Sequence, residues 1–171
     1  MWRPATNTRF IRWDAAVSKY EDADRFHNRK HPRLKQYDYA TPNYYFVTIC
    51  TWEKSCIFGM PERANSLGCI AERAIENIPV HFQGVSVDKY VIMPNHIHAI
   101  LVLEGETNLA TVIGQYKSAV TKEIHVWNPH MKVWQTSFHD HIIRNQEDYA
   151  RIWAYIDTNP ARWMEDCFYT P

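Results

Sequence analysis

The sequence has few cysteines, and none is spaced as a metal-binding or redox pair. The four are Cys50, Cys56, Cys69 and Cys167, and no two of them form a C-x-x-C motif. This argues against a zinc ribbon and against a dithiol redox site. Cys50 lies within an apolar segment, where we expect it to be a small buried hydrophobic residue.

Long apolar runs are also absent. No stretch approaches the roughly 18 apolar residues of a membrane span, and no apolar segment typical of a secretion signal follows the opening Met-Trp-Arg-Pro. We therefore expect a cytoplasmic protein in a reducing setting, with no membrane partner. A hydrophobic share of 46% over 171 residues fits one packed domain.

The chain has no net charge, with 19 basic and 19 acidic residues. This counts against a nucleic-acid binder, because such proteins are often basic overall. The charge is unevenly distributed, however, since residues 25–35 hold five Lys or Arg side chains and no acid. Aromatic residues make up 14% of the chain, and such rings often hold planar partners at surfaces. The alternative for any one ring is a place in the core.

Hydrophobic periodicity predicts one domain in which helices and strands alternate. Strands are expected over residues 43–51, 85–93, 96–103 and 133–138. Helices are expected over residues 61–78, from Asn108 to about residue 126, and over residues 146–158. The second and third strands form a hairpin across a tight turn at Pro94-Asn95. This order predicts an α+β fold of the ferredoxin-like or RRM-like kind, an antiparallel sheet packed with helices, and such sheets often bind nucleic acids.

His96 and His98 lie at the start of the third predicted strand. Because side chains alternate between the two faces of a strand, both imidazoles point to one side and could share a divalent ion. The alternative is two ordinary histidines on a polar sheet face, since the H-x-H pattern is common. Two polar side chains on an apolar strand favour the metal site, which then needs a third ligand from elsewhere in the chain.

Tyr155 and Asn159 lie four residues apart at the end of the last predicted helix. At this spacing a phenol and an amide oxygen project together, as a nucleophile beside a metal ligand requires. Asn159 precedes Pro160, and an equally good interpretation makes it the N-cap of the next short helix. The alternative interpretation of Tyr155 is an ordinary half-buried aromatic residue of the helix. Two other tyrosines are candidate nucleophiles. Tyr149 lies on a different side of the helix from Tyr155, and Tyr116 lies in an apolar helical stripe.

Several ordered blocks of the chain resemble the REP-associated tyrosine transposases. These are relatives of the single-tyrosine insertion-sequence transposases within the HUH endonucleases. The resemblance spans about residues 29–163 and rests on residues 33–39, 45–51, 90–98, 113–121, 141–145, 148–149, 155–156 and 159–160. One departure is His139, which stands where many relatives carry Tyr.

The resemblance implies a metal-dependent endonuclease that acts on single-stranded DNA. His96 and His98 match the metal-binding histidines of the family, and Tyr155 matches its nucleophile on a C-terminal helix. Asn159 matches the polar residue that completes the metal site. Family members use Mg²⁺ or Mn²⁺ and cleave near imperfect palindromic hairpins. They keep a 5′-phosphotyrosine, which a 3′-hydroxyl can rejoin without ATP.

Resemblance and charge together suggest how DNA is held. The basic N-terminal segment could contact phosphates, and tyrosines beside it could stack on unpaired bases. The alternative interpretation of the basic segment is a solvated arm. The candidate DNA-binding residues are Arg29, Lys30, Arg33, Lys35, Tyr37, Tyr39, Lys117 and Arg144.

The same comparison predicts the domain organisation. Residues 1–28 lie outside the resemblance and form an arm of unassigned role, while residues 29–171 form one catalytic domain. A monomer is favoured over a homodimer.

Two other functions stay open at this point. One is a catalytically inactive module that binds hairpin DNA without cutting it. The other is an unrelated metal hydrolase built on the H-x-H pair. That hydrolase needs carboxylates near the histidines, and Asp88 and Glu104 are the only close candidates along the sequence.

Overall fold

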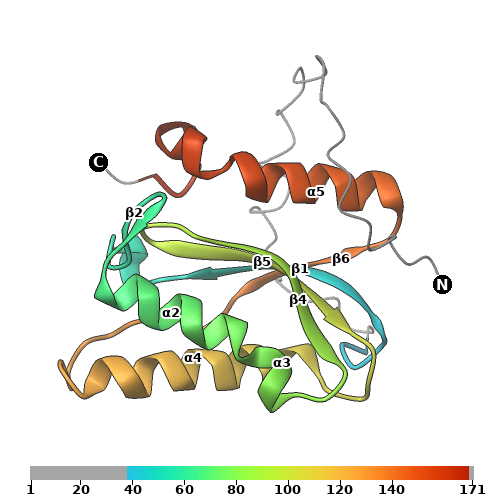
Figure 1. Cartoon of the computed structure of the whole chain (residues 1–171), viewed down its shortest axis with the longest axis horizontal. Helices are drawn as coiled ribbons and strands as arrows, with labels where there is room; N and C mark the ends of the chain where they lie inside the picture. The colour runs from blue at the N-terminus through green and yellow to red at the C-terminus, as the bar shows by residue number, and fades with distance from the viewer. Residues whose placement is uncertain (1–37, 170–171) are drawn as a thin grey trace.

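The fold is built around one antiparallel sheet with helices on both faces. In the computed structural model, which describes residues 38–169, the strands are ordered β4 (Val85–Ile92), β5 (His96–Leu103), β1 (Asn43–Cys50) and β6 (His139–Ile143). Helix α5 (Gln146–Thr158) lies on one face, and α2 (Ser66–Glu76), α3 (Ile78–His81) and α4 (Leu109–His125) lie on the other (Figure 1). The central strand β5 is buried along its whole length. The predicted α+β architecture is therefore confirmed.

Alternation along the strands divides the interior into two layers. Tyr45, Val47 and Ile49 of β1 point into the larger core beneath α2 and α4. Phe46, between them in the chain, points to the opposite face and packs with Ile152 and other residues of α5. The period of two thus gives each strand one face toward α5 and one toward the helical layer.

The predicted strand over residues 133–138 is wrong, and the edge strand is β6 instead. Residues 139–143 pair with β1 in the register Thr48 opposite His139. The preceding segment crosses the end of β1, where only Trp134 forms an isolated bridge with Thr51. Val133 and Phe138 are buried in the core. These residues are apolar because they are buried and not because they pair in a strand. The apolar pattern therefore wrongly predicted a strand here.

The predicted helix over residues 61–78 is shorter and in two parts. A small hairpin of β2 (Gly59–Met60) and β3 (Arg63–Ala64) precedes α2. Helix α2 begins after Asn65, whose Oδ1 accepts hydrogen bonds from the backbone N–H groups of Leu67 and Gly68. These two bonds satisfy backbone N–H groups of the first helical turn, which have no partner within the helix. Pro79 lies in the first turn of α3, where a missing backbone N–H leaves no helical hydrogen bond unmade.

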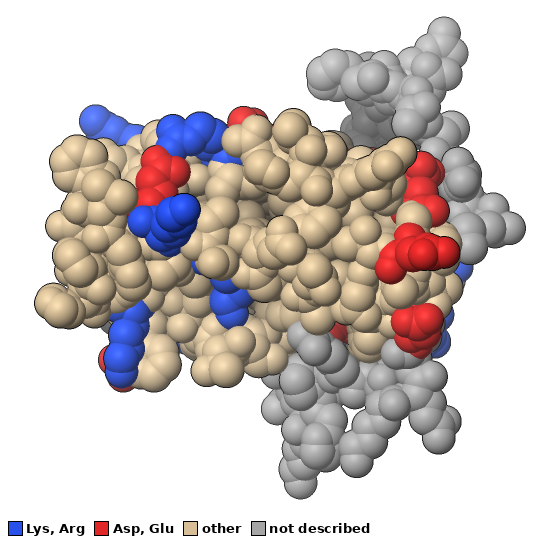
Figure 2. Space-filling model, turned by 90° about the horizontal axis from the view of Figure 1, so that it is seen from below, with Lys and Arg blue, Asp and Glu red and all other residues tan. Residues whose placement is uncertain are grey.

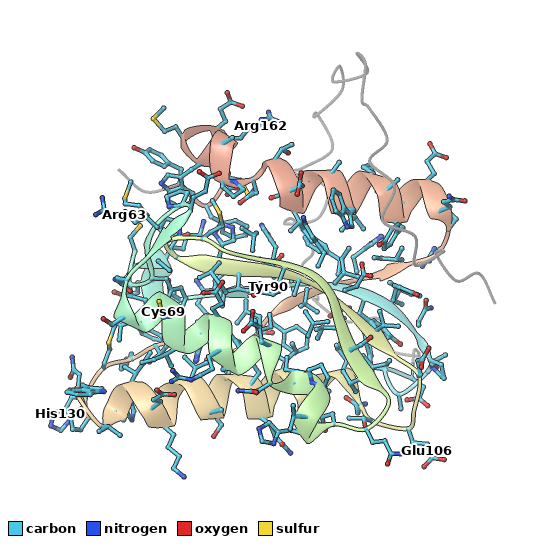
Figure 3. The ribbon with its side chains drawn as sticks, in the orientation of Figure 1. Arg63, Cys69, Tyr90, Glu106, His130 and Arg162 are labelled. Atoms are coloured by element: carbon cyan, nitrogen blue, oxygen red, sulfur yellow. The ribbon has the colours of Figure 1, made fainter. Side chains whose placement is uncertain are left out.

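The remaining helices and the hairpin agree with the sequence pattern. Asn108 caps α4 through a 2.8 Å hydrogen bond to the N–H of Ala110. Asn145 caps α5 in the same way, 2.9 Å from the N–H of Asp148. At the edge of the sheet, Tyr90 of β4 donates a 2.7 Å hydrogen bond to Glu76 of α2 (Figure 3). Among residues 38–169, none of the helices is long and apolar enough to cross a membrane.

Gly68 is expected to tolerate no larger residue. A Cβ built there would lie 2.4 Å from the carbonyl oxygen of Phe58, closer than packed atoms approach. We predict that Gly68→Ala lowers the free energy of unfolding by about 1–3 kcal/mol, which chemical denaturation will measure. Gly114→Ala on α4 is the control, because no atom from another part of the described fold lies within 4 Å of its Cβ position. That change should stabilise the protein by up to about 1 kcal/mol through helix propensity. Equal effects at the two sites would contradict this packing.

Candidate active site

Strand β5 brings the two histidines together on the face that α5 covers. His96 and His98 are both fully buried, and their ring centroids lie 4.5 Å apart. In the register with β1, His98 lies opposite Thr48 and His96 lies opposite Cys50. The sequence therefore predicted correctly that the strand would place both imidazoles on one side.

Hydrogen bonds fix how each imidazole is presented. His96 Nδ1 lies 2.9 Å from Asn95 Oδ1. The amide nitrogen of Asn95 donates to the carbonyls of Lys54 and Phe168, so its oxygen must be the acceptor for His96. His96 Nδ1 then carries the proton, and its Nε2 presents a lone pair. His98 Nδ1 is held by Thr48 Oγ1 at 2.9 Å. Contacts of this kind orient metal-binding histidines.

Tyr155 of α5 lies directly above this pair. Its hydroxyl is 3.2 Å from His98 Nε2 and 3.4 Å from Asp166 Oδ2. The ring packs edge-on against Phe46, with centroids 6.1 Å apart. Burial raises the pKa of the Tyr155 phenol, and the negative charge of Asp166 raises it further, while the amide of Asn159 offsets part of the rise. The hydroxyl is therefore protonated at neutral pH and needs a nearby positive charge to become a nucleophile.

Asn159 lies where α5 passes into the short helix η3 (Pro160–Glu165), whose outer surface carries Arg162 (Figure 3). The Asn159 side chain is 3% exposed and makes no capping hydrogen bond. The predicted alternative of a side-chain N-cap is therefore wrong, because the amide turns inward. Its Nδ2 donates to Asp166 Oδ2 at 2.7 Å.

Asp166 is the site residue that the sequence analysis missed. One nitrogen each from His96 and His98 and one carboxylate oxygen of Asp166 all lie within 4.8 Å of one another. Within residues 38–169 this is the only such group of three His, Cys, Asp or Glu side chains. Asp166 follows η3 and shares no helix or strand with the other site residues, so no periodicity in the sequence points to it.

The donor atoms present fit a divalent metal ion. Two imidazole nitrogens with carboxylate or amide oxygens suit Mn²⁺, which accepts both donor types, better than Mg²⁺, which prefers oxygen alone. Trp163 and Phe168 pack near His96, with ring centroids 6.1 and 4.6 Å away. These rings exclude water, which strengthens interactions between charges at the site.

Several predicted site residues lie elsewhere. Tyr39 is buried in the core and packs against Tyr45, so it cannot stack on DNA bases in this conformation. Lys117 lies on α4, on the sheet face opposite Tyr155, where its ammonium donates to the carbonyls of Gln135, Thr136 and Ser137. We therefore correct the assignment of Tyr39, which packs in the core. Lys117 holds the loop before β6, and its contact with DNA stays a prediction. On the helical face, Figure 2 shows basic side chains scattered over the left half rather than forming one basic patch, while acidic side chains gather at the right edge.

The roles of the remaining candidate DNA-binding residues also stay predictions. Arg144 is exposed in the short connection between β6 and α5. The remaining five lie outside the described residues: Arg29, Lys30, Arg33, Lys35 and Tyr37.

The other candidate nucleophiles and metal ligands make their contacts away from the histidine pair. Tyr149 donates a 2.8 Å hydrogen bond to Asp88, and Tyr116 is buried with its hydroxyl on the carbonyl of Ala71. Asp88 therefore serves the N-terminal half of α5 rather than the histidine pair. Glu104 follows the last residue of β5, at the opposite end of that strand from His96. Neither Asp88 nor Glu104 joins the histidine cluster among the described residues, so the two carboxylates that an unrelated H-x-H hydrolase was expected to use lie elsewhere.

A second network holds the start of α5 against β6. His141 Nε2 lies 2.7 Å from Asp148 Oδ2, and Arg151 donates to the other carboxylate oxygen at 2.7 Å. Burial acts to raise the pKa of Asp148, but the hydrogen bonds from Arg151 and His141 outweigh it and the pKa is lowered. The carboxylate form of Asp148 therefore stabilises the folded protein.

We predict that Asp148→Asn lowers the free energy of unfolding by about 1–2 kcal/mol at pH 7, because Arg151 and His141 lose their carboxylate acceptor. A group whose pKa is lowered by folding stabilises above its unfolded pKa of about 4, and that stabilisation is lost as the pH falls through the folded value. The difference in stability between variant and wild type should therefore shrink in denaturation curves as the pH falls below about 4. Glu147→Gln, at the exposed neighbouring position, should change stability little. A gap that persists unchanged at acid pH would contradict this role.

Comparison with known proteins agrees with this geometry. Residues 40–159 match the family described as "Transposase IS200 like". A protein of unassigned function from Haemophilus influenzae is 33% identical over 84% of this chain and 94% of its own length. A REP-associated tyrosine transposase of Escherichia coli is 31% identical over 46% of this chain and 47% of its own length.

A solved structure shares the fold. It is a REP-associated tyrosine transposase bound to a REP hairpin, with a TM-score of 0.61 and 21% identity. The match covers 76% of this chain and 73% of the other. Because the family match spans most of the chain and includes the histidine pair, Tyr155 and Asn159, the chain belongs to the IS200-like transposases, within which it resembles the REP-associated tyrosine transposases.

Proposed function

We propose that this protein cleaves and rejoins single-stranded DNA at imperfect, REP-like palindromic hairpins. The observation that carries the proposal is the position of the Tyr155 hydroxyl, 3.2 Å from His98 Nε2 and beside the buried histidine pair. A nucleophile and a set of metal-binding donors thus meet at one point. The resemblance to REP-associated transposases supports the choice of a hairpin substrate.

The proposed reaction is an in-line attack by Tyr155 on a phosphodiester. A bond forms between the tyrosine oxygen and phosphorus, and the bond from phosphorus to the 3′ oxygen breaks. The phenol gives up its proton, and the departing 3′ oxygen takes one up to become a hydroxyl. The DNA 5′ end is then held as a phosphotyrosine. Attack by a second 3′-hydroxyl reverses the step and joins strands without an external energy source.

His96 and His98 would hold a divalent ion, Mn²⁺ or Mg²⁺, with an oxygen ligand from the C-terminal part of the chain, where the sequence predicts Asn159. Such an ion, when bound, polarises a phosphate oxygen and favours the ionised form of a nearby phenol. Thr48 and Asn95 orient the two imidazoles, while Phe46 positions the tyrosine ring.

We propose that one chain builds the complete site and acts as a monomer. Helix α5 is tied to its own sheet by Lys89, which pairs with Asp157 at 2.5 Å and lies 3.9 Å from the centroid of the Trp153 ring. Only Arg144 and Asn145 separate α5 from β6. These contacts favour a tyrosine that attacks within its own subunit. The arm over residues 1–28 and a cytoplasmic location remain predictions.

Incubation with a 5′-unpaired hairpin oligonucleotide and Mn²⁺ tests the proposed activity. We expect a covalent protein–DNA species that survives denaturing electrophoresis and that does not form with a duplex of the same sequence. If the hairpin binds but neither a cleaved strand nor a covalent species forms, the inactive hairpin-binding module is the better description.

A further inference from the structure

The turn that follows β1 is held by the same asparagine that orients the first histidine. This turn contains the short helix η2 (Trp52–Lys54). Asn95 binds His96 Nδ1 through its oxygen, and its amide nitrogen donates to the carbonyl of Lys54 at 3.0 Å. The hydroxyl of the buried Thr51 donates to the carbonyl of Asn95 at 2.9 Å. The backbone of Lys54 is therefore fixed relative to His96.

Two neighbouring residues of this turn have a backbone conformation that L-residues disfavour. Glu53 has a φ of 53° and Lys54 has a φ of 56°. Both values lie in the left-handed region, where the Cβ is crowded by the backbone. Glycine adopts this conformation at little cost, but neither residue is glycine. Such strain persists only where surrounding contacts hold it, and it is frequent at functional sites. The turn therefore directs attention to what the Lys54 side chain does.

The ammonium of Lys54 lies beside the histidine pair, separated from it by one aromatic ring. Its Nζ is 5.0 Å from the centroid of the Phe168 ring, and that ring is 4.6 Å from the ring of His96. Cys50, opposite His96 in the sheet, also experiences this charge. Burial raises the pKa of the Cys50 thiol to about 11, and Lys54 has the largest effect among the charged groups, lowering it. Both observations place a positive charge at the edge of the site.

No carboxylate neutralises the Lys54 ammonium among the described residues, where its contact is with the ring of Phe168. A contact with a ring face leaves the N–H groups of an ammonium available to an anion. Three cations elsewhere on the α5 side of the sheet each pair with an acid: Lys89, Arg151 and Arg162. Lys54 can therefore bind a phosphate without first giving up an acidic partner.

We propose that Lys54 binds a backbone phosphate of the single-stranded DNA, next to the phosphate that Tyr155 attacks. Phosphates repeat along a strand, so a strand whose scissile phosphate lies at the histidine pair brings a neighbouring phosphate to the edge of the site. A lysine acts there as a point charge, which fixes the register of the strand without reading its bases. The inference rests on the proposed function and adds a substrate contact that neither the metal ligands nor the nucleophile supplies.

Hairpin binding by Lys54→Met tests this contact, in a Tyr155→Phe background so that no strand is cut. Methionine keeps an unbranched stem that can cover Phe168, but it carries no charge. We expect the Kd for a 5′-unpaired hairpin to rise about tenfold at low salt. The slope of log affinity against log salt should become shallower by about 0.7, the value for one phosphate contact with a single strand. Lys54→Arg should restore most of the affinity and the slope.

Lys122→Met is the matched control. This lysine is exposed on α4, on the sheet face opposite Tyr155, and its loss should leave the Kd and the salt slope unchanged. A second measurement separates a phosphate contact from damage to the site. The Mn²⁺ affinity of the DNA-free protein, followed by the electron paramagnetic resonance signal of the unbound ion, should be the same with Lys54 and with Met at this position.

A neutral methylphosphonate, placed at one position of the unpaired strand at a time, identifies the phosphate that Lys54 contacts. At a position adjacent to the cleavage site, this change should weaken binding about tenfold when Lys54 is present. It should weaken binding little further in Lys54→Met, because the contact is already lost.

Three results would overturn the inference while hairpin cleavage by wild type stays intact. One is an unchanged Kd and salt slope in Lys54→Met. Another is an equal loss in Lys122→Met, which would make the effect one of total charge. The third is a methylphosphonate scan in which every position affects both proteins equally. If the Tyr155→Phe protein with Lys54 binds no hairpin, the substrate of the proposed function is wrong and the inference fails with it.

Discussion

Tyr155→Phe is expected to abolish the covalent protein–DNA species and to reduce hairpin cleavage by at least about a thousandfold. The substitution removes one oxygen, the atom that lies 3.2 Å from His98 Nε2. The ring remains to pack against Phe46, so the fold and the binding of DNA should persist. A denaturing gel with an end-labelled hairpin measures cleavage, and a native gel measures binding.

Tyr149→Phe is the matched control on the same helix. Its hydroxyl binds Asp88 and does not reach the histidine pair. We expect cleavage to stay within a fewfold of wild type, with at most a modest loss of stability. A Tyr155→Phe protein that still forms the covalent species would move the nucleophile to another residue and would reject the assignment of this site.

His98→Ala should have the second large effect, because this ring contacts both the proposed metal and the nucleophile. Excess Mn²⁺ at about a hundred times its Kd should stabilise wild type by about 2.7 kcal/mol, visible as a higher Tm. We predict that His98→Ala shows no such stabilisation and loses cleavage by at least about a thousandfold. Thermal unfolding with and without Mn²⁺ measures the first effect, and the hairpin gel measures the second.

His141→Ala controls for the loss of a histidine from the same sheet face. His141 pairs with Asp148 at the start of α5, away from the metal cluster. This variant should keep the rise in Tm on addition of Mn²⁺. If both variants kept it equally, His98 would have no part in binding the ion.

The sequence predicted the sheet and its histidine pair because both follow from local rules. Alternation along a strand needs no tertiary information, so residues 43–51 and 96–103 were assigned within a residue or two. The placement of Tyr155 over this pair drew on the resemblance to a family. The segment with Val133 and Phe138 was wrongly assigned as a strand. Its apolar residues are buried in the core without pairing in the sheet.

Asp166 illustrates why the rest of the site could not be predicted. It comes near the histidines because η3 turns the chain back across the end of the sheet, and no pattern in the sequence gives that turn its direction. Thr48 is a similar case. Its bond to His98 depends on the pairing of β1 with β5, which strand periodicity leaves open. Tyr39, expected at a DNA surface from its neighbours in the chain, is held in the core by contacts with distant residues.

Mass spectrometry of the covalent protein–DNA species tests the central claim most directly. The species formed with a hairpin substrate and Mn²⁺ is digested with protease and nuclease, and the peptide that retains a 5′-nucleotide is sequenced. We predict that the nucleotide is attached to Tyr155. Attachment to Tyr149, Tyr116 or any other side chain would contradict the active site described above.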